Sequence, residues 1–190
     1  GFSVLQAQDM QQMPAVGESD LLRSLQLLPG IQAASDISSG LYVRGGGPDQ
    51  TRILLDQVPL YNPSHAFGFF STFNPDAIKD VSLYKGVYPA AYGGNLGALL
   101  DVQNREGNRQ TLSGRGGLSL ISGRLLLEGP IGTGAWMLSG RRTYLDPVLS
   151  AVRASGANVP SYYFYDFNGK FSQRLGPSDE LVISTYFGQD

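Results

Sequence analysis

The chain has 190 residues, of which 42% are hydrophobic and only 16% are charged, with 25 glycines and 10 tyrosines. Ordinary soluble domains carry about a quarter charged residues, so this chain is short of solvent-facing charge. The net charge of −2 argues against a nucleic-acid partner, since neutralising phosphates requires an excess of Lys and Arg. Cysteine is absent, and one histidine, His65, is too few for a His-cluster metal site.

The first half of the chain is predicted to form a small α+β domain that begins with a short helix. Glu18-Ser19-Asp20 offers capping oxygens, and leucines follow at helical spacing on one face: Leu21, Leu22, Leu25 and Leu28. Pro29 and Gly30 should end this helix, because proline cannot continue the hydrogen-bond ladder and glycine accepts a left-handed cap.

Two short strands, at residues 40–44 and 52–58, are predicted to flank a glycine-rich bend. Its consecutive glycines, from Gly45 to Gly47, permit backbone torsions that are closed to other residues, and Pro48-Asp49 is ordinary turn chemistry. The bend lacks the Lys-Ser/Thr pair of a phosphate-binding loop. It is therefore interpreted as a structural turn.

The rest of this domain is predicted to add a helix and two strands. Asn74 followed by Pro75 predicts a helix start, a capping residue before one pre-set for the first turn. Strands are expected at 81–85 and 99–104. Several glycines are expected to serve backbone geometry and close packing: Gly86, Gly93, Gly94 and Gly97. A group of phenylalanines is expected to pack against neighbouring structure rather than to bind a partner: Phe67, Phe69, Phe70 and Phe73.

From Thr111 onward the sequence shows repeated two-residue periodicity. The clearest stretch places aromatic residues on one parity (Tyr163, Tyr165, Phe167 and Phe171) and polar residues on the other (Asp166, Asn168, Lys170, Ser172 and Arg174). Successive strand side chains point to opposite faces, so one face is apolar and the other polar. Such strands suit a membrane barrel with a wet lumen, and a soluble β-sandwich gives a similar alternation. The charges on the polar parity tilt the interpretation toward the barrel, but a dry sandwich core would rest on Tyr163, Phe167 and Phe171 as well. Only a resemblance to a known family separates the two.

Several segments, taken in order, resemble the plug domain of TonB-dependent outer-membrane receptors. They are Ser24-Leu-Gln-Leu-Leu-Pro-Gly-Ile, Tyr42-Val-Arg-Gly-Gly, Ile53-Leu-Leu-Asp-Gln-Val-Pro, Leu83-Tyr-Lys-Gly-Val-Tyr-Pro-Ala-Ala-Tyr-Gly-Gly and Leu99-Leu-Asp-Val. Residues 63–81 and the segment Ser139-Gly-Arg-Arg-Thr-Tyr-Leu-Asp resemble the Bacteroidetes-type version of these receptors. Gln57 departs from the pattern, because the family usually has glycine there, and no convincing TonB box is recognised within these 190 residues.

The resemblance implies an α+β plug domain at residues 1–108. It also implies that residues 109–190 are the N-terminal part of an antiparallel transmembrane β-barrel, a fragment of the 22-stranded barrels that enclose a plugged lumen. Implied partners are TonB with its inner-membrane motor, a nutrient substrate, outer-membrane lipid and, in one variant, a surface lipoprotein. No cofactor is implied. The implied location is the outer membrane of a Gram-negative bacterium, and we expect the chain to be the front portion of a longer receptor.

The resemblance also implies roles for individual residues. Arg44 and Arg52 bracket the glycine bend and would pair with carboxylates of the barrel wall, since a guanidinium fork suits a reversible bidentate pair. Asp56 and Asp101 are expected to be structural partners within the plug. Three plug loops would face outside and bind ligand, where aromatic and amide groups suit sugars, peptides or chelates: Gln32 and Ser35; Asp49 and Gln50; and Tyr61, Asn62, Ser64 and His65. Plain solvation is the alternative role for each of these residues.

The predicted function is TonB-energised uptake of a scarce nutrient, namely an iron chelate, a vitamin, a peptide or a glycan, through a barrel gated by the plug. The alternative is a soluble α+β binding or adhesion module with a β-sandwich tail. An enzyme is not predicted, because the sequence offers no nucleophile–base pair and no carboxylate dyad with a definable cleft.

Overall fold

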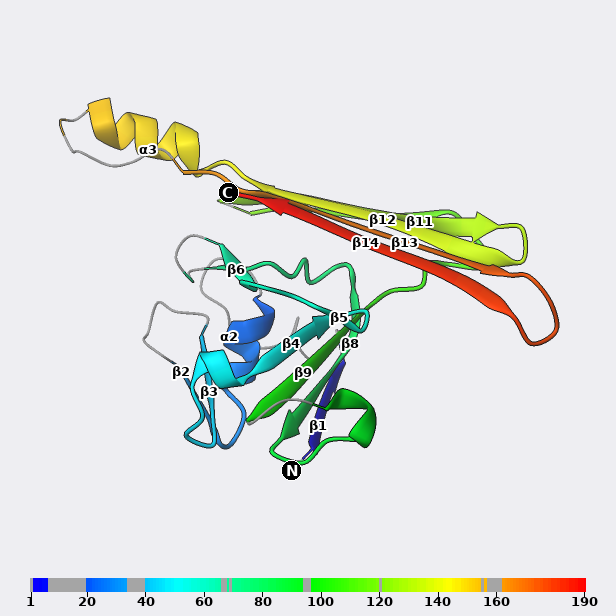
Figure 1. Cartoon of the computed structure of the whole chain (residues 1–190). Helices are drawn as coiled ribbons and strands as arrows, with labels where there is room; N and C mark the ends of the chain where they lie inside the picture. Colours follow the sequence, from blue (N-terminus) through cyan, green and yellow to red (C-terminus); the bar gives the residue numbers. More distant parts are fainter. Residues whose placement is uncertain are drawn as a thin grey trace. The chain divides into compact units, whose positions relative to one another are not determined.

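The structure is a computed structural model that describes residues 2–6, 20–33, 40–65, 68, 70–93, 97–119, 121–154, 156 and 162–190. The chain divides into two compact units, Gly1–Asn104 and Arg105–Asp190 (Figure 1). Among the described residues, no helix is long and apolar enough to cross a membrane.

The first unit, which we call the plug unit, is built on one mixed sheet. Its strand order is β1-β8-β9-β4-β5, where only β4 and β9 run parallel. The strands are β1 (Phe2–Gln6), β4 (Arg52–Leu55), β5 (Val58–Pro59), β8 (Ile78–Lys85) and β9 (Ala98–Asn104). Two small pairs accompany this sheet: β2 (Ile31–Ala33) with β3 (Leu41–Val43), and β6 (Ser64–His65) with β7 (Phe70–Ser71). The remaining elements are α2 (Leu21–Gln26) and two short 3-10 turns, η1 (Pro48–Gln50) and η3 (Ala90–Tyr92).

The predicted first helix is confirmed from its first residue. The carboxylate of Asp20 accepts a hydrogen bond from the backbone N–H of Arg23 at 3.1 Å and from that of Ser71 at 2.6 Å. One capping side chain therefore starts α2 and ties it to β7. The helix ends at Gln26, and Gly30 adopts φ +79° shortly afterwards. Leu21, Leu22 and Leu25 are buried, and α2 packs against β2 and β3.

The core of the plug unit is built around the central strands of its main sheet. The register aligns Leu83 with Leu100 and Val81 with Val102, and all four side chains are buried. Each buried aliphatic side chain of this size contributes about 1.5–3 kcal/mol of transfer free energy. Phe70 and Phe73 are also buried, as predicted, whereas Phe67, Phe69 and Gly94 lie outside the described residues.

The prediction of one strand over residues 52–58 is wrong, because a tight turn divides it into β4 and β5. Asp56 and Gln57 both have positive φ, +48° and +69°, which is the pattern of a two-residue type I′ hairpin. The Asp56 carboxylate accepts hydrogen bonds from the backbone N–H and the side-chain amide of Asn104, each at 3.0 Å. The turn therefore keeps its left-handed shape although Gln57 replaces the usual glycine.

The helix predicted after Asn74 is also absent, and a single turn takes its place. The Asn74 side-chain oxygen accepts a hydrogen bond from the N–H of Asp76 at 3.1 Å, and the Asn74 carbonyl accepts one from Ala77 at 3.0 Å. From Ile78 the chain pairs with β9 instead. Sheet pairing thus overrides a local helix-start signal.

The second unit, which we call the strand unit, is one antiparallel meander in chain order. Its strands are β10 (Ser113–Leu118), β11 (Ser122–Ile131), β12 (Gly134–Thr143), β13 (Tyr165–Arg174) and β14 (Glu180–Gln189). The predicted alternating strands are confirmed. A helix, α3 (Leu145–Ala154), lies in the connection between β12 and β13 and was not predicted. Pro147, in its first turn, is the signal that could have found it.

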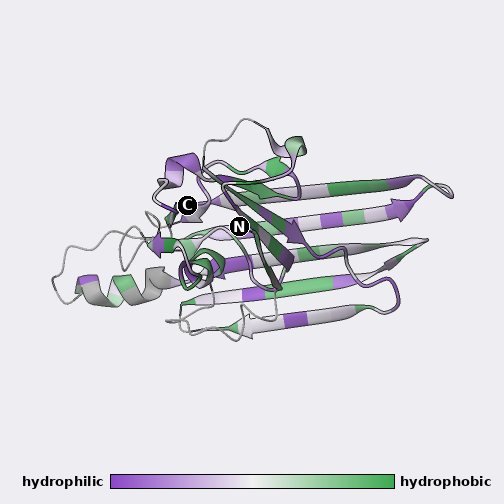
Figure 2. Cartoon of the chain, turned by 90° about the horizontal axis from the view of Figure 1, so that it is seen from below, coloured by the Kyte–Doolittle hydropathy of each residue, from purple (hydrophilic) through white to green (hydrophobic). Residues whose placement is uncertain are grey.

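The two faces of the strand unit differ in chemistry. The apolar face carries Leu125, Leu127, Leu138, Phe167, Ile183 and Phe187, which are 41–54% exposed. The polar face carries Arg124, Glu128, Arg141, Asp166, Asn168 and Lys170. The changes of hydropathy along the long strands are visible in Figure 2. Among the described residues of this unit, the strands form one five-stranded sheet.

Candidate functional site

The glycine bend is a two-residue hairpin turn whose first central residue is Arg44. Val43 and Gly46 exchange backbone hydrogen bonds of 3.0 and 2.9 Å, and φ is +50° at Arg44 and +85° at Gly45. Both central residues are left-handed, as a type I′ turn requires. A long side chain at such a position costs of order 1 kcal/mol and persists only where surrounding structure enforces it. The turn holds the exposed Arg44 side chain out at the end of the hairpin.

One group of predicted ligand residues gathers beside this turn. Gln32 pairs with Tyr42 across the β2–β3 hairpin, and both side chains are exposed. Asp49 and Gln50 lie in η1, which packs against β3, and they too are exposed. Tyr42 was not predicted, although its position between the buried Leu41 and Val43 marks it as outward-facing. Ser35 lies outside the described residues.

The second predicted group, in the loop after β5, is divided by the structure. Tyr61 is 97% exposed, and Asn62 adopts φ +53° next to it. Ser64 is half-buried at the start of β6. His65 is only 5% exposed and pairs with Phe70 between β6 and β7. The expectation that His65 presents its imidazole to the outside is therefore not met, because strand pairing turns it inward.

Arg52 has an internal partner. Its guanidinium donates a hydrogen bond to the carbonyl of Gly93 at 3.2 Å, which joins β4 to the segment after η3. A cleft of about 360 Å³ lies on this face of the sheet, lined by Arg52, Leu54, Gln57, Ala91 and Tyr92. Arg44 differs from Arg52, because among the described residues its side chain makes no hydrogen bond or ion pair.

Tyr92 fixes the same segment to the sheet. Its hydroxyl donates a hydrogen bond to the Asp101 carboxylate at 3.0 Å, and Asp101 is 3% exposed. Burial and the neighbouring Asp101 carboxylate raise the pKa of the Tyr92 hydroxyl, because both disfavour the phenolate. Asp56 and Asp101 are thus structural partners within the plug unit, as predicted.

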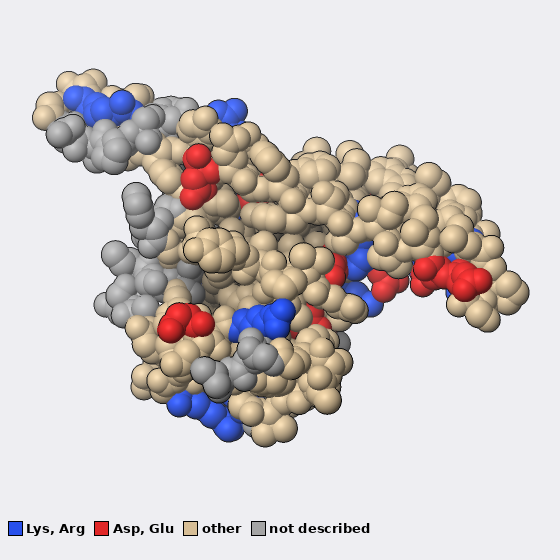
Figure 3. All heavy atoms as spheres, in the orientation of Figure 1, with Lys and Arg blue, Asp and Glu red and all other residues tan. Residues whose placement is uncertain are grey.

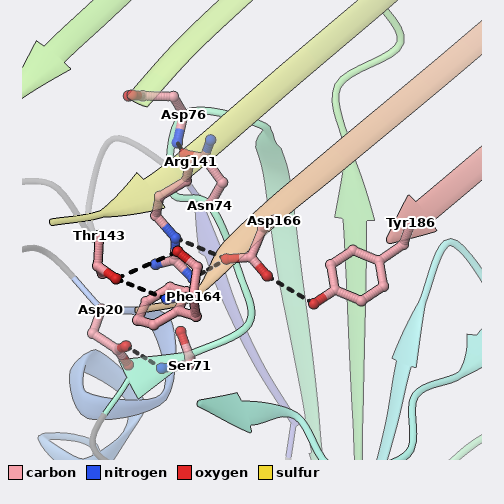
Figure 4. A network of polar contacts seen from close by, with 9 residues as sticks. All are labelled: Asp20, Ser71, Asn74, Asp76, Arg141, Thr143, Phe164, Asp166 and Tyr186. Carbon is pink, nitrogen blue, oxygen red and sulfur yellow. Dashed lines mark hydrogen bonds and ion pairs between the residues drawn. The ribbon is translucent and has the colours of Figure 1, made fainter. Parts of the chain in front are cut away.

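The polar face of the strand unit contains a buried ion pair. The Arg141 guanidinium donates to one Asp166 oxygen from Nε at 2.9 Å and from a terminal nitrogen at 2.6 Å, and both side chains are buried (Figure 4). Tyr186 donates its hydroxyl to the other Asp166 oxygen at 2.9 Å, and Arg141 also lies 5.0 Å from the centre of the Phe164 ring. Three neighbouring strands are thereby tied together. The alternation along the strand predicted that Asp166 lies on the polar face, but only the register of β12 against β13 shows that Arg141 is its partner.

These residues offer groups that form hydrogen bonds, stack on rings and form ion pairs. Exposed amide, phenol and carboxylate groups flank one hairpin turn of the plug unit, and all but one of the charged side chains in β10–β14 lie on a single sheet face. Among the described residues, no group of three or more His, Cys, Asp or Glu side chains could hold a metal ion.

These elements define a small α+β domain followed by an antiparallel meander of long strands. The family model of the TonB-dependent receptor plug domain matches residues 2–99, about half of the chain, and the chain belongs to this family. Comparison with curated protein sequences gives no match.

Solved structures share the fold over the whole chain. The siderophore receptor PirA from Pseudomonas aeruginosa is 20% identical with a TM-score of 0.70, over 99% of this chain and 35% of that chain. A ferric enterobactin receptor mutant (PfeA) from the same organism, in complex with enterobactin, is 21% identical with a TM-score of 0.68, over 99% and 33%. The copper transporter OprC is 14% identical with a TM-score of 0.67, over 98% and 30%. The chain thus spans about a third of the length of these proteins.

Proposed function

We propose that this chain is the plug and the first barrel strands of an outer-membrane receptor for TonB-energised uptake of a scarce nutrient. The observation that carries the proposal is the strand unit, whose strands of about ten residues are apolar and exposed on one face and charged on the other. Further strands would complete a 22-stranded barrel around the plug. The implied cell is a Gram-negative bacterium, and residues 63–81 favour the Bacteroidetes-type subgroup.

The proposed ligand surface is the set of exposed residues near the glycine bend, Gln32, Tyr42, Asp49 and Gln50, together with Tyr61 and Asn62 of the second loop. Stacking on tyrosine and hydrogen bonding to amides suit an iron chelate, a vitamin, a peptide or a glycan. A growth screen of a deletion strain on each of these sources, one at a time, tests the substrate class. Growth equal to that of the parent strain on every source would contradict an uptake role.

The proposed mechanism is gating by the plug, with TonB pulling on it from the periplasm and, in one version, a surface lipoprotein helping to capture substrate. Arg44 is the stronger candidate for holding the plug in the barrel. Its guanidinium is exposed on a strained turn, whereas Arg52 is engaged by the Gly93 carbonyl. A bidentate pair with a barrel carboxylate would release reversibly under force.

Charge reversal tests this role of Arg44 in the full-length receptor. Arg44→Glu should raise passive leakage of small antibiotics, because repulsion would replace the proposed ion pair. Lys79→Glu is the matched control, since Lys79 is an exposed cation in β8, away from the bend. Equal leakage for both variants, with uptake unchanged, would remove Arg44 from this role.

Detergent dependence separates the receptor from the soluble alternative. A receptor of this design needs detergent or lipid to cover the apolar face of the strand unit, whereas a soluble binding module would stay monomeric in plain buffer. Analytical ultracentrifugation of the full-length protein after detergent removal makes the comparison. A stable, detergent-free monomer would refute the membrane proposal.

A further inference from the structure

One charged side chain of β10–β14 lies on the opposite sheet face from all the others. Within β10–β14, the charged side chains lie on the polar face: Arg115, Arg124, Glu128, Arg141, Asp166, Lys170, Arg174 and Glu180. The exception is Arg142, which the register places on the apolar face beside Gly123 and Tyr165. In the space-filling view the upper surface over β11–β14 is mostly uncharged, and charged atoms show along its lower edge (Figure 3). A single cation on such a face requires an explanation.

The two neighbouring arginines of β12 have opposite surroundings. Arg141 is buried and paired with Asp166, whereas Arg142 is exposed and, among the described residues, makes no hydrogen bond or ion pair. The Arg142 guanidinium lies over the Tyr163 ring, with its central carbon 5.7 Å from the ring centre. Gly123 beside it has no side chain. The guanidinium is therefore held by an aromatic face, and its hydrogen-bond donors remain open to an incoming group.

The position of Arg142 along its strand corresponds to a membrane interface. On the apolar face of β12, Gly134 begins the strand and Arg142 lies eight residues further, a rise of about 27 Å. A strand tilt of about 40° reduces this to about 21 Å along the membrane normal, close to the height of the lipid-facing band of such barrels. On this face Trp136, Leu138 and Gly140 lie between them, so the Arg142 guanidinium is at the end of the apolar face of β12. An arginine costs little there, although it is costly at the bilayer centre.

The lengths of the connections between strands indicate which of the two membrane interfaces Arg142 occupies. At the end opposite Arg142, β11–β12 and β13–β14 are joined by short turns at 132–133 and 175–179. At the end of Arg142, β10 and β11 are joined by the short connection 119–121, whereas β12 and β13 are joined by the long segment 144–164, which contains α3. Among these connections the long one is found only at this end. Barrels of this class have short periplasmic turns and longer extracellular loops. Arg142 therefore lies at the outer leaflet.

We propose that Arg142, supported by the Tyr163 ring, binds a phosphate group on the head group of an outer-leaflet lipid. A planar guanidinium offers a fork of donors that matches phosphate, and it can stack on an aromatic ring at the same time. Tyr165, whose hydroxyl donates to Gln189, is the neighbour of Arg142 on β13 and adds polar groups at the same height. The site is continuous with the apolar face that the acyl chains would cover. This inference rests on the proposed membrane location.

The test uses the full-length receptor in nanodiscs that contain either bis-phosphorylated lipid A or its dephosphorylated form. Native mass spectrometry after a mild detergent wash counts the lipid that stays bound. Arg142→Gln should reduce retained bis-phosphorylated lipid about tenfold, the loss expected for one charge-assisted contact. Tyr163→Leu should reduce it about threefold, because the stacking support is lost while the cation remains. Arg115→Gln, on the polar face of β10, is the matched control and should retain lipid as the unmodified receptor does.

Three results would overturn the site. In the first, Arg142→Gln retains as much bis-phosphorylated lipid as Arg115→Gln. In the second, Arg142→Gln loses dephosphorylated lipid to the same extent as bis-phosphorylated lipid. In the third, Arg142→Gln dissociates an oligomer, which would assign this face to a second copy of the receptor. If Arg142→Gln fails to insert, Tyr163→Leu alone decides by the same comparison of lipids. The parent receptor's need for detergent is scored separately, so loss of the lipid site leaves the proposed uptake function standing.

Discussion

The plug unit and the strand unit use the same two-residue alternation for opposite purposes. In the plug unit, apolar side chains such as Leu83 and Leu100 are buried in a closed core. In the strand unit, apolar side chains such as Leu138 and Phe167 are exposed, and polar groups such as Asp166 and Asn168 are the buried ones. The pattern along the strand is common to both, and the surroundings of each face differ.

This contrast shows that alternation of apolar and polar residues identifies the two faces of a strand, but not which face is buried by other parts of the protein. Leu126, Ala135 and Met137 are buried in the strand unit, yet they share their face with Glu128, Arg141 and Asp166. A face that mixes apolar residues with paired charges suits a filled or wet lumen, and a face of leucine, phenylalanine and glycine suits hydrocarbon. The strand unit is therefore organised in the reverse sense of a soluble sheet.

The largest expected effect comes from breaking the ion pair on the polar face. Asp166→Ala should destabilise the full-length receptor by about 3–5 kcal/mol, because it leaves the buried Arg141 without a carboxylate. Replacing both partners, as Arg141→Met with Asp166→Leu, should recover most of that loss. Thermal unfolding in detergent measures both. If the single and double variants unfold at the same temperature, the pair does not have the structural role given to it here.

The next effect compares the two kinds of apolar position directly. Leu100→Ala in the plug unit should cost about 3 kcal/mol, because it leaves a cavity in a packed core. Leu138→Ala on the apolar face should cost about 1 kcal/mol, since lipid or detergent fills the space and no cavity forms. Hydrogen exchange of the β8–β9 amides and of the β11–β13 amides reports the two changes. Equal losses would mean that the face of Leu138 is packed like a core.

The smallest effect concerns the Tyr92 hydrogen bond and has a pH dependence of its own. Because the folded state raises the pKa of Tyr92, it holds the proton more tightly than the unfolded chain. The contribution of Tyr92 to the free energy of unfolding is complete below its ordinary pKa of 10.0. It is lost as pH rises through the higher pKa that Tyr92 has in the folded state. Tyr92→Phe should cost about 1–2 kcal/mol at neutral pH, by leaving a buried Asp101 oxygen unpaired, and should remove that alkaline loss.

Urea unfolding of the plug at pH 8 and pH 11 measures this effect for the unmodified chain and for Tyr92→Phe. Tyr61→Phe is the control, because Tyr61 is exposed and should change neither the stability nor its slope with pH. If the free energy of unfolding of Tyr92→Phe still falls between pH 8 and pH 11 as it does in the unmodified chain, other groups cause the pH dependence.

Local signals predicted the elements that depend on neighbours in sequence. The capping oxygens of residues 18–20 and the leucine spacing after them predicted the start of α2, and the parity of residues 163–174 predicted β13 and its two faces. The same kind of signal failed at Asn74-Pro75, where pairing with β9 is stronger than a local helix start. It also failed at Asp56-Gln57, where a carboxylate bound to Asn104 makes the turn without glycine.

The candidate sites show the same division. Gln32, Asp49, Gln50 and Tyr61 are exposed as their loop positions predicted, whereas His65 is turned inward by pairing with Phe70. Arg44 and Arg52 were equivalent in sequence, but the Gly93 carbonyl engages only Arg52. Arg141 and Arg142 were one dipeptide, and the strand sends one to each face.

The sequence alone determined what each stretch prefers by itself: where a helix can begin, where glycine allows a left-handed turn, and which residues share a strand face. These preferences depend on torsions and on side chains a few positions apart. The tertiary structure decided which carboxylate faces which arginine and which tyrosine anchors which loop, because such contacts join residues that are distant in the chain. Arg141 and Asp166, 25 residues apart, meet only when β12 and β13 pair in one register and no other.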